Sequence, residues 1–315
     1  MKLSVLDLVP LAPGAGSAEA LGQALRLAQT AEQLGYHRYW AAEHHDLPNL
    51  ACTAPEVLLA HIGAQTSSIR LGTGALLLPH YKAMKVAETF HLLASLYPGR
   101  IDLGLGRAPG GSAHAAIALS GNFLEGVRQL PDTLRSLLQL LEGRFRVENE
   151  PVTARPVPDL PPEVWLLGTN SKSAALAAEH GTGYVFGQFM SDQDAAPALA
   201  AYRQAYRPSK LAPAPRAIVA VGVVCAETEA QALRLAAEGR TALQPQGPGE
   251  GGAEEAEADP AAGRKLIAGT PAQVKARLQA LAEQSGADEL IIVTHVADYE
   301  QRLRSYALLA QAVWG

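Results

Sequence analysis

Residues 39–46 read Tyr39-Trp40-Ala41-Ala42-Glu43-His44-His45-Asp46, and this stretch holds the pattern that decides the fold. A short apolar run, typical of a buried strand, ends abruptly in a group of ionisable side chains. Histidine titrates near neutral pH, so the acid and the two histidines beside it are candidates for proton transfer. Metal ligation, helix capping and core packing are the alternatives. The stretch predicts a strand that ends at a polar site.

The same alternation runs along the whole chain. Short apolar runs, each followed by a segment with hydrophobic residues at helical spacing, cover residues 3–9, 39–43, 69–78, 101–105, 164–167, 184–187, 217–224 and 289–294. These runs are nearly continuous in apolar residues, as expected for parallel strands buried on both faces. Eight strands with a helix after each predict an α/β fold, a (β/α)8 TIM barrel that forms a single domain over residues 1–315. A doubly wound open sheet is the alternative architecture.

Two segments interrupt this pattern. Residues 144–162 are rich in proline and charge, and we expect them to form an excursion before the fifth strand. Residues 245–263 combine glycine, proline, alanine and acidic residues after the seventh strand, a low-complexity composition that predicts a mobile insert. We expect this insert either to act as a lid over the carboxyl ends of the strands or to be a disordered surface segment. Pro131 predicts a kink in the helical pattern of residues 123–141.

Composition narrows the class of protein. The chain has 315 residues, of which 48% are hydrophobic and 18% charged, with a formal net charge of −5. This balance gives no electrostatic reason to expect nucleic acid or an anionic membrane as a partner. No apolar run is long enough for a membrane span or a signal peptide, and two distant cysteines, Cys52 and Cys225, fit a reducing compartment rather than a disulfide scaffold. We therefore expect a cytoplasmic protein.

The active site of a barrel of this kind lies at the carboxyl ends of its strands. The fifth strand ends in Gly168-Thr169-Asn170-Ser171-Lys172-Ser173, where a helix begins at once. Backbone N–H groups at a helix N-terminus, with hydroxyl and amide donors beside them, can bind one phosphate, and Arg107 after the fourth strand would supply the positive charge. Capping of the helix by Asn170 or Ser171 explains the same residues without a ligand. The sequence leaves both interpretations open.

Two familiar motifs can be excluded. The run Gly104-Leu105-Gly106-Arg107-Ala108-Pro109 starts like a dinucleotide-binding fingerprint, but Pro109 stands at the third glycine and no helix follows directly. Glu43-His44-His45 lacks the spacing of a His-Glu-x-x-His zinc site, and no other cluster of histidines or cysteines completes a ligand set. We therefore expect no metal site.

The strand ends together resemble those of the bacterial luciferase-like flavin monooxygenases, a (β/α)8 family that uses reduced FMN and O2. The matching stretches are residues 39–45, Arg70-Leu71-Gly72-Thr73-Gly74 with Leu78-Pro79, residues 98–107, Trp165-Leu166-Leu167-Gly168-Thr169, and Ala268-Gly269-Thr270-Pro271. The resemblance covers essentially the whole chain. It implies a homodimer with the helices after strands two and three at the interface, and a separate flavin reductase that supplies reduced FMN.

The resemblance implies a role for each matching residue. His44 resembles the histidine that acts as an acid or base near the flavin, with Glu43 orienting it or packing beneath it and His45 as a neighbour. Ala75 lies where the family often has a non-prolyl cis peptide bond under the isoalloxazine ring. The other implied cofactor contacts are a phosphate site at Arg107, Gly168, Thr169, Asn170 and Ser173 and flavin walls at Leu76, Gly104 and Gly106.

The function implied by the resemblance is a two-component monooxygenase acting on a small organic substrate such as an aldehyde or ketone. Light-emitting members use a cysteine on strand four, whereas this chain has Leu103-Gly104-Leu105-Gly106 there, so we expect no bioluminescence. Two alternatives remain. The first is an F420-dependent hydride-transfer enzyme of the same superfamily. The second is a catalytically silent flavin-binding barrel.

Overall fold

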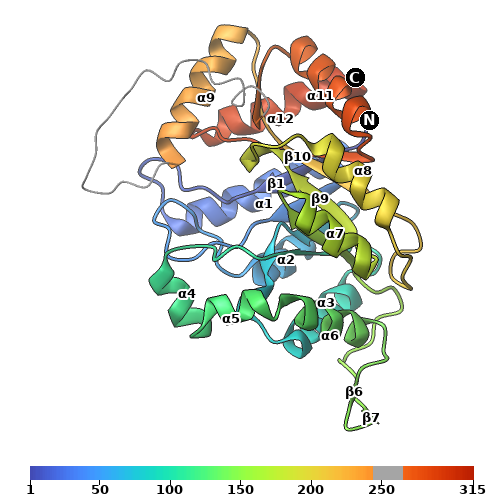
Figure 1. Ribbon diagram of the computed structural model, residues 1–315. Coiled ribbons are helices and arrows are strands. Elements are labelled where there is room, and N and C mark those ends of the chain that lie inside the picture. Colours follow the sequence, from blue (N-terminus) through green and yellow to red (C-terminus); the bar gives the residue numbers. More distant parts are fainter. Residues whose placement is uncertain (244–264) are drawn as a thin grey trace.

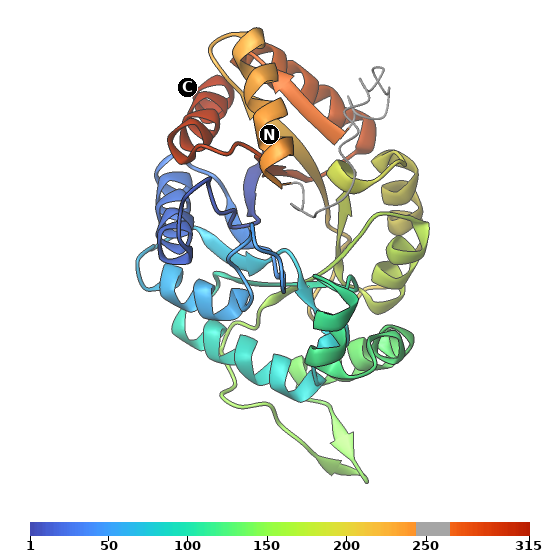
Figure 2. The same cartoon turned by 90° about the vertical axis from the view of Figure 1, so that its left-hand side faces the viewer.

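The computed structural model describes residues 1–243 and 265–315. Its centre is a closed barrel of parallel strands with helices on the outside (Figure 1). Figure 2 shows the helices arranged around the strands. The barrel strands, in the order in which they pair, are β1 (Leu3–Asp7), β2 (Arg38–Ala41), β3 (Arg70–Thr73), β5 (Ile101–Gly106), β8 (Glu163–Gly168), β9 (Gly183–Gly187), β10 (Ala217–Cys225) and β12 (Glu289–Val293). Because β12 pairs with β1 in parallel, the sheet closes on itself, and the predicted (β/α)8 fold is confirmed.

The helices of the described part alternate with these strands. They are α1 (Ser17–Gln33), α2 (Pro55–Gly63), α3 (Ala83–Leu96), α4 (Ala113–Ser120), α5 (Phe123–Arg128), α6 (Leu130–Leu141), α7 (Ser171–His180), α8 (Ala195–Ala205), α9 (Glu229–Leu243), α11 (Pro271–Ser285) and α12 (Tyr299–Trp314), with short 3-10 helices η1 (Leu78–His80) and η2 (Gln188–Met190). The strands are buried on both faces, and in β10 every residue is buried. This explains their nearly continuous apolar sequence. None of the described helices combines the length and apolar composition needed to cross a membrane.

The predicted third strand is not continuous. It breaks after β3 at the cis peptide bond between Gly74 and Ala75, and β4 (Leu76–Leu77) then pairs with β5 instead of β2. The backbone N–H of Leu77 donates to the carboxylate of Glu43 at 2.8 Å rather than to a neighbouring strand. The prediction of one strand over residues 69–78 was therefore wrong, because a side chain takes the place of the β2 backbone as hydrogen-bond acceptor.

Other boundaries also differ from the sequence pattern. The helical pattern of residues 123–141 is divided into α5 and α6, because Pro131 lies in the first turn of α6, where a missing N–H is tolerated. A strand that the sequence did not indicate, β11 (Leu266–Gly269), pairs with the carboxyl half of β10. Residues 144–162 do form an excursion, with the antiparallel hairpin of β6 (Arg146–Val147) and β7 (Glu150–Pro151) projecting from the barrel in Figure 1. The insert predicted at residues 245–263 lies outside the described residues.

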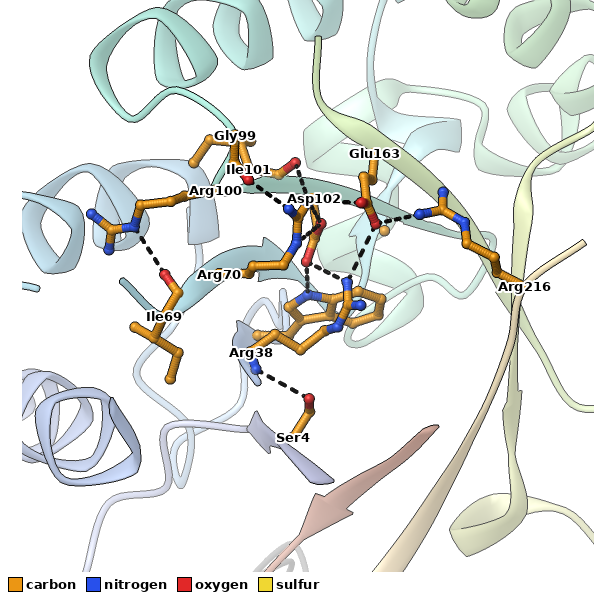
Figure 3. Close-up of polar contacts among 12 residues, drawn as sticks. Ser4, Arg38, Ile69, Arg70, Gly99, Arg100, Ile101, Asp102, Glu163 and Arg216 are labelled. Carbon is orange, nitrogen blue, oxygen red and sulfur yellow. Dashed lines mark hydrogen bonds and ion pairs between the residues drawn. The ribbon is translucent and has the colours of Figure 1, made fainter. Parts of the chain in front are cut away.

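The amino ends of the strands carry a network of buried and half-buried charges, and Figure 3 labels all of its members except Glu289. Its members lie in β2, β3, β5, β8 and β12 and directly before β10, and they are Arg38, Arg70, Asp102, Glu163, Glu289 and Arg216. Arg38 is central: it donates to Asp102 at 2.7 Å and to Glu289 at 2.8 Å, and its guanidinium lies 4.9 Å from the ring centroid of Trp165. Because Arg38 is paired with both Asp102 and Glu289, none of these three buried side chains is left as a lone charge.

A small apolar cluster lies within the barrel. It contains Leu6, Trp40, Ala42, Trp165, Val185, Ile218, Ala220, Ile291 and Val293. Trp40 connects this cluster with the charges below it, because its indole N–H donates to Asp102 at 2.9 Å. The amino end of the barrel is therefore filled by ion pairs and indole rings. Among the described residues, the cavity inside the barrel lies at the carboxyl ends of the strands.

Candidate active site

A cavity of about 380 Å³ lies at the carboxyl ends of the strands. Residues that follow β2, β3, β5, β8 and β9 meet around it, as the barrel topology requires. Its lining combines residues predicted from the sequence, namely His44, Ala75, Gly106, Arg107, Gly168, Thr169, Asn170 and Ser173, with further residues such as Leu6, Leu8, Glu43, Leu77, Leu167, Val185, Phe189, Met190 and Ala220. The cavity is thus mostly apolar, with its polar groups concentrated at two places.

His44 forms one of these polar places. It follows β2 by three residues and is half-buried, and its backbone N–H donates to the carbonyl of Cys52 at 2.9 Å. Its Nδ1 atom is buried and has no hydrogen-bond partner among the described residues. Burial, and next the neighbouring His45, lower the pKa of His44 below its usual value, while the carbonyl of Ala42 acts in the opposite direction. The imidazole is therefore largely neutral at pH 7 and can accept a proton.

Glu43 does not contact His44. Its carboxylate instead accepts hydrogen bonds from Tyr81 Oη at 2.8 Å and from the backbone N–H of Leu77 at 2.8 Å, and it lies 2.7 Å from His45 Nε2. Of the two roles suggested for Glu43, orienting His44 or packing beneath it, the first has no hydrogen bond to support it among the described residues. Both residues line the cavity, but the carboxylate of Glu43 is used by Leu77, Tyr81 and His45.

Arg107 and the N-terminus of α7 form the second polar place. β5 and β8 are neighbours, with Leu105 opposite Leu166, so their carboxyl ends bring Arg107 close to Gly168. Arg107 is exposed and has no ion-pair partner within residues 1–243 and 265–315. A free guanidinium beside a helix N-terminus is a suitable site for a phosphate.

The helix cap at this place is also present. The side-chain oxygen of Asn170 accepts from the backbone N–H groups of Lys172 and Ser173, each at 3.1 Å. The hydroxyl of Ser173 donates to the carbonyl of Asn170 at 2.7 Å and contacts Tyr184 Oη at 3.0 Å. The hydrogen bonds of the helix cap therefore already use Asn170 Oδ1 and the hydroxyl of Ser173. Arg107 and the hydroxyl of Thr169, which line the cavity, have no hydrogen-bond partner among the described residues and are left for a ligand.

Two residues expected at the flavin do not line the cavity. Leu76 is buried in the main hydrophobic core between the strands and the outer helices. Gly104 lies against the neighbouring strand, where an added Cβ would be 2.0 Å from the carbonyl oxygen of Thr73. This glycine therefore permits the close approach of β3 and β5. Both residues shape the cavity only through the strands that they hold in place.

Part of the cavity wall escaped the sequence analysis. Phe189 and Met190 lie in η2, directly after β9, so the rule that site residues follow strand ends could have identified them. Leu6 and Ala220 lie within strands, and their inward orientation depends on how the barrel closes. No group of three or more His, Cys, Asp or Glu side chains in the described part of the chain is placed to hold a metal ion.

Neither cysteine lines the cavity, and both are expected to be chemically inert. Burial, and next the neighbouring acidic groups, raise the pKa of Cys52 and of Cys225 to about 12. At pH 8 we expect the native thiols to react with an aromatic disulfide reagent at least about a hundredfold more slowly than the thiols of the urea-unfolded chain. Stopped-flow absorbance measures both rates. Rapid labelling of one thiol in the folded protein would contradict the burial seen here.

Comparison with known proteins gives the family. A family model described as luciferase-like monooxygenase matches residues 1–289. The chain is 41% identical over 331 residues to the uncharacterized protein YwcH of Bacillus subtilis (strain 168), an alignment that covers 99% of each chain. It is 33% identical over 322 residues to a luciferase-like monooxygenase of Escherichia coli (strain K12), with 97% of this chain and 95% of that one covered.

Solved structures agree with this match. The crystal structure of apo-MsnO8 is similar with a TM-score of 0.88 and 36% identity, covering 99% of this chain and 98% of that one. More distant structures share the fold alone. They include the oxygenating constituent of 3,6-diketocamphane monooxygenase from Pseudomonas putida in complex with FMN (TM-score 0.72, 19% identity, 99% and 97% covered) and an F420-dependent secondary alcohol dehydrogenase with an F420–acetone adduct (TM-score 0.73, 14% identity, 100% and 99% covered). With a family model that spans most of the sequence and full-length relatives above 30% identity, the chain belongs to the luciferase-like monooxygenase family.

Proposed function

We propose that the chain is an FMN-dependent monooxygenase that receives reduced FMN from a separate flavin reductase and uses O2 on a small aldehyde- or ketone-like substrate. The observation that carries this proposal is one cavity that joins a free arginine and a helix N-terminus with a half-buried histidine across apolar walls. A phosphate-bearing, flat, largely apolar cofactor needs this combination. The family match supports the same class of reaction.

The residues present fit such a cofactor. Arg107 and the hydroxyl of Thr169 would hold the phosphate beside the N-terminus of α7, because both line the cavity and neither donor is used within the described structure. Ala75 and Leu77 would lie against the ring system. The buried Nδ1 of His44 has no hydrogen-bond partner among the described residues, and such an atom is costly unless a ligand or water satisfies it.

The chemistry divides between cofactor and protein. Reduced FMN, when bound, supplies the electrons with which O2 is activated. The protein residues bind and orient it, and the apolar side chains of Leu8, Phe189 and Met190 exclude water from the reacting groups. His44, neutral at pH 7, holds or moves a proton at its imidazole nitrogens.

The lining of the cavity also indicates the class of substrate. Arg107 is the only Lys or Arg side chain among the residues described that lines it, and the phosphate would occupy that charge. The remaining walls are mainly glycine, alanine and leucine residues, with Val185, Phe189 and Met190. An uncharged, small organic molecule therefore suits the space better than a charged one, since a buried charge needs a partner.

A homodimer is part of this proposal. α2 and α3 follow the second and third strands, and they carry exposed apolar side chains, Val57 at 66%, Leu92 at 50% and Leu96 at 55% exposure. Apolar side chains gathered on two adjacent outer helices suit an interface between two copies of the chain. The reductase would act as a separate partner.

The replacement Arg107→Ala tests the phosphate site. We expect it to raise the dissociation constant of FMN by about tenfold to a hundredfold, because a charge-assisted hydrogen bond is lost. Quenching of flavin fluorescence measures the affinity. Arg135→Ala is the matched control, because Arg135 is an exposed arginine of α6 outside the cavity, and we expect it to leave the affinity unchanged.

A parallel experiment distinguishes FMN from the alternative cofactor, F420. FMN and F420 are added in parallel, and the midpoint of thermal unfolding is followed, since a bound ligand stabilises the fold by mass action. We expect protection by FMN and none by F420. Protection by F420 alone would favour a hydride-transfer enzyme. Protection by FMN without consumption of O2 across a panel of aldehydes and ketones would favour a silent flavin-binding barrel.

A further inference from the structure

The carboxylate of Glu43 is buried beside the cavity, and the residue as a whole is only 2% exposed. It has three contacts to donors that come from two segments. Leu77 N–H donates to Oε2 at 2.8 Å, Tyr81 Oη donates to Oε1 at 2.8 Å, and His45 Nε2 lies 2.7 Å from Oε1. A buried carboxylate with fully used oxygens holds its neighbours firmly, because each broken bond leaves an unsatisfied buried group.

The backbone of Glu43 makes a further bond to the same segment. Its N–H donates to the carbonyl of Ala75 at 3.2 Å, while its side chain holds the N–H of Leu77. Glu43 therefore contacts the Ala75–Leu77 segment at both ends. The pairing of β2 with β3 ends at Thr73, so Leu76 and Leu77 are held by strand pairing only on the side of β5. The carboxylate supplies the missing hydrogen bond.

The partners of Glu43 are themselves fixed in place. Burial, and next Glu43 itself, raise the pKa of Tyr81 above its usual value, so the phenol keeps the proton that it donates. The backbone N–H of His45 donates to the carbonyl of Gly110 at 2.8 Å, and its ring lies edge-on to His80 with 6.0 Å between the ring centroids. Tyr81 and His45 thus approach the same carboxylate oxygen from different segments.

We propose that Glu43 is a positioning residue, which fixes the Ala75–Leu77 wall of the cavity relative to His44, the next residue in the chain. Ala75, Leu77 and His44 all line the cavity. The inference rests on the proposed function in one respect, since it takes this wall to be the surface against which the flavin ring lies. Glu43 does not itself take part in proton transfer. It acts by holding the Ala75–Leu77 wall in place relative to His44.

The replacements Glu43→Ala and Glu43→Gln test this role with two readouts. In the cofactor-free protein, we expect Glu43→Ala to speed hydrogen exchange of the Leu77 amide by at least about tenfold, because its acceptor is lost. We expect the same variant to raise the dissociation constant of FMN by about tenfold to a hundredfold. Glu43→Gln keeps an acceptor oxygen for Leu77, and we expect it to restore both values to within about threefold of wild type.

A pair of tyrosine replacements provides the matched control and does not depend on the folding of Glu43→Ala. Tyr81→Phe removes one hydrogen bond to Glu43, whereas Tyr97→Phe removes one of similar length, 2.7 Å to the carbonyl of Ala60, away from the cavity. We expect Tyr81→Phe to raise the FMN dissociation constant about threefold to tenfold and to speed exchange at Leu77. We expect Tyr97→Phe to change neither.

The outcomes separate the two proposals. Unchanged exchange at Leu77 in both Glu43→Ala and Tyr81→Phe overturns the positioning role. Equal losses of FMN affinity in Tyr81→Phe and Tyr97→Phe also overturn it, because they would reflect general destabilisation. If wild type binds no FMN while exchange at Leu77 still responds to Glu43, the proposed function fails and the hydrogen-bonded contact of Glu43 with the wall stands.

Discussion

Replacement of His44 by alanine is expected to lower the turnover number by roughly 10²–10⁴-fold. His44 lines the cavity, and the lowered pKa of its buried imidazole keeps it neutral and able to accept a proton at pH 7. The side chain is not part of the phosphate site, so we expect FMN affinity to stay within about threefold of wild type. Steady-state rates with reductase-supplied FMN and a panel of aldehydes and ketones measure the first effect, and fluorescence titration the second.

The control for His44→Ala is His61→Ala. His61 is exposed on α2 and contacts Gln65, and it does not line the cavity. We expect this variant to retain wild-type turnover. Wild-type turnover in His44→Ala would show that this histidine is structural. A large loss of FMN affinity in His44→Ala would instead place it among the groups that bind the cofactor.

The pH dependence of turnover provides a second check on His44. A base with a lowered pKa loses activity only when the pH falls below the usual range of histidine, near 6.5. We therefore expect the acidic limb of the rate profile to lie below pH 6.5. Because His45 contributes to the lowering, His45→Gln is expected to move this limb toward higher pH. A limb above pH 7 in wild type would rule out His44 as its source.

The largest expected effect on stability is that of Asp102→Asn. Asp102 is fully buried and bonds to Arg38, Arg70 and the indole of Trp40. Removal of one partner from a buried ion pair leaves an uncompensated charge, and we expect a loss of about 3–5 kcal/mol in the free energy of unfolding. Urea unfolding followed by circular dichroism measures it.

Asp132→Asn is the matched control, because Asp132 pairs with Arg135 on the exposed surface of α6. Exposed ion pairs contribute about 0–1 kcal/mol, so we expect little change in the urea midpoint. An equal loss in both variants would mean that the buried network is not what stabilises the amino end of the barrel.

The carboxylate of Asp102 also makes the free energy of unfolding depend on pH. Burial alone would raise the pKa of Asp102, but Arg38 and then Arg70 outweigh it, so the pKa lies below the ordinary value of 3.8. An acid with a lowered pKa stabilises the fold at every pH above the unfolded value, and this contribution disappears as the pH falls through the folded value. The difference in unfolding free energy between wild type and Asp102→Asn should therefore shrink below pH 4.

The positions of the catalytic candidates along the chain were predictable from sequence. Apolar runs that end in His44, Arg107 and Thr169 mark the strand ends, because parallel strands buried on both faces have few polar residues until they reach the rim. The alternation of strands with helices was enough to predict the barrel, which the structure confirms. Local pattern carries this information because it follows from hydrophobic burial of each element.

Only the tertiary structure decided which hydrogen bonds these residues make and which of them have no partner. The sequence allowed two interpretations of the α7 N-terminus, a phosphate site and a helix cap. The structure shows that the cap uses Asn170 Oδ1. Arg107, at the end of the strand that pairs with β8, has no partner among the described residues. It also shows that Glu43 contacts Leu77 and Tyr81, not His44. The physical reason is that a hydrogen bond depends on distance and direction between segments far apart in sequence. Strand register and barrel closure fix these quantities, whereas the pattern of apolar and polar residues fixes only which positions reach the site.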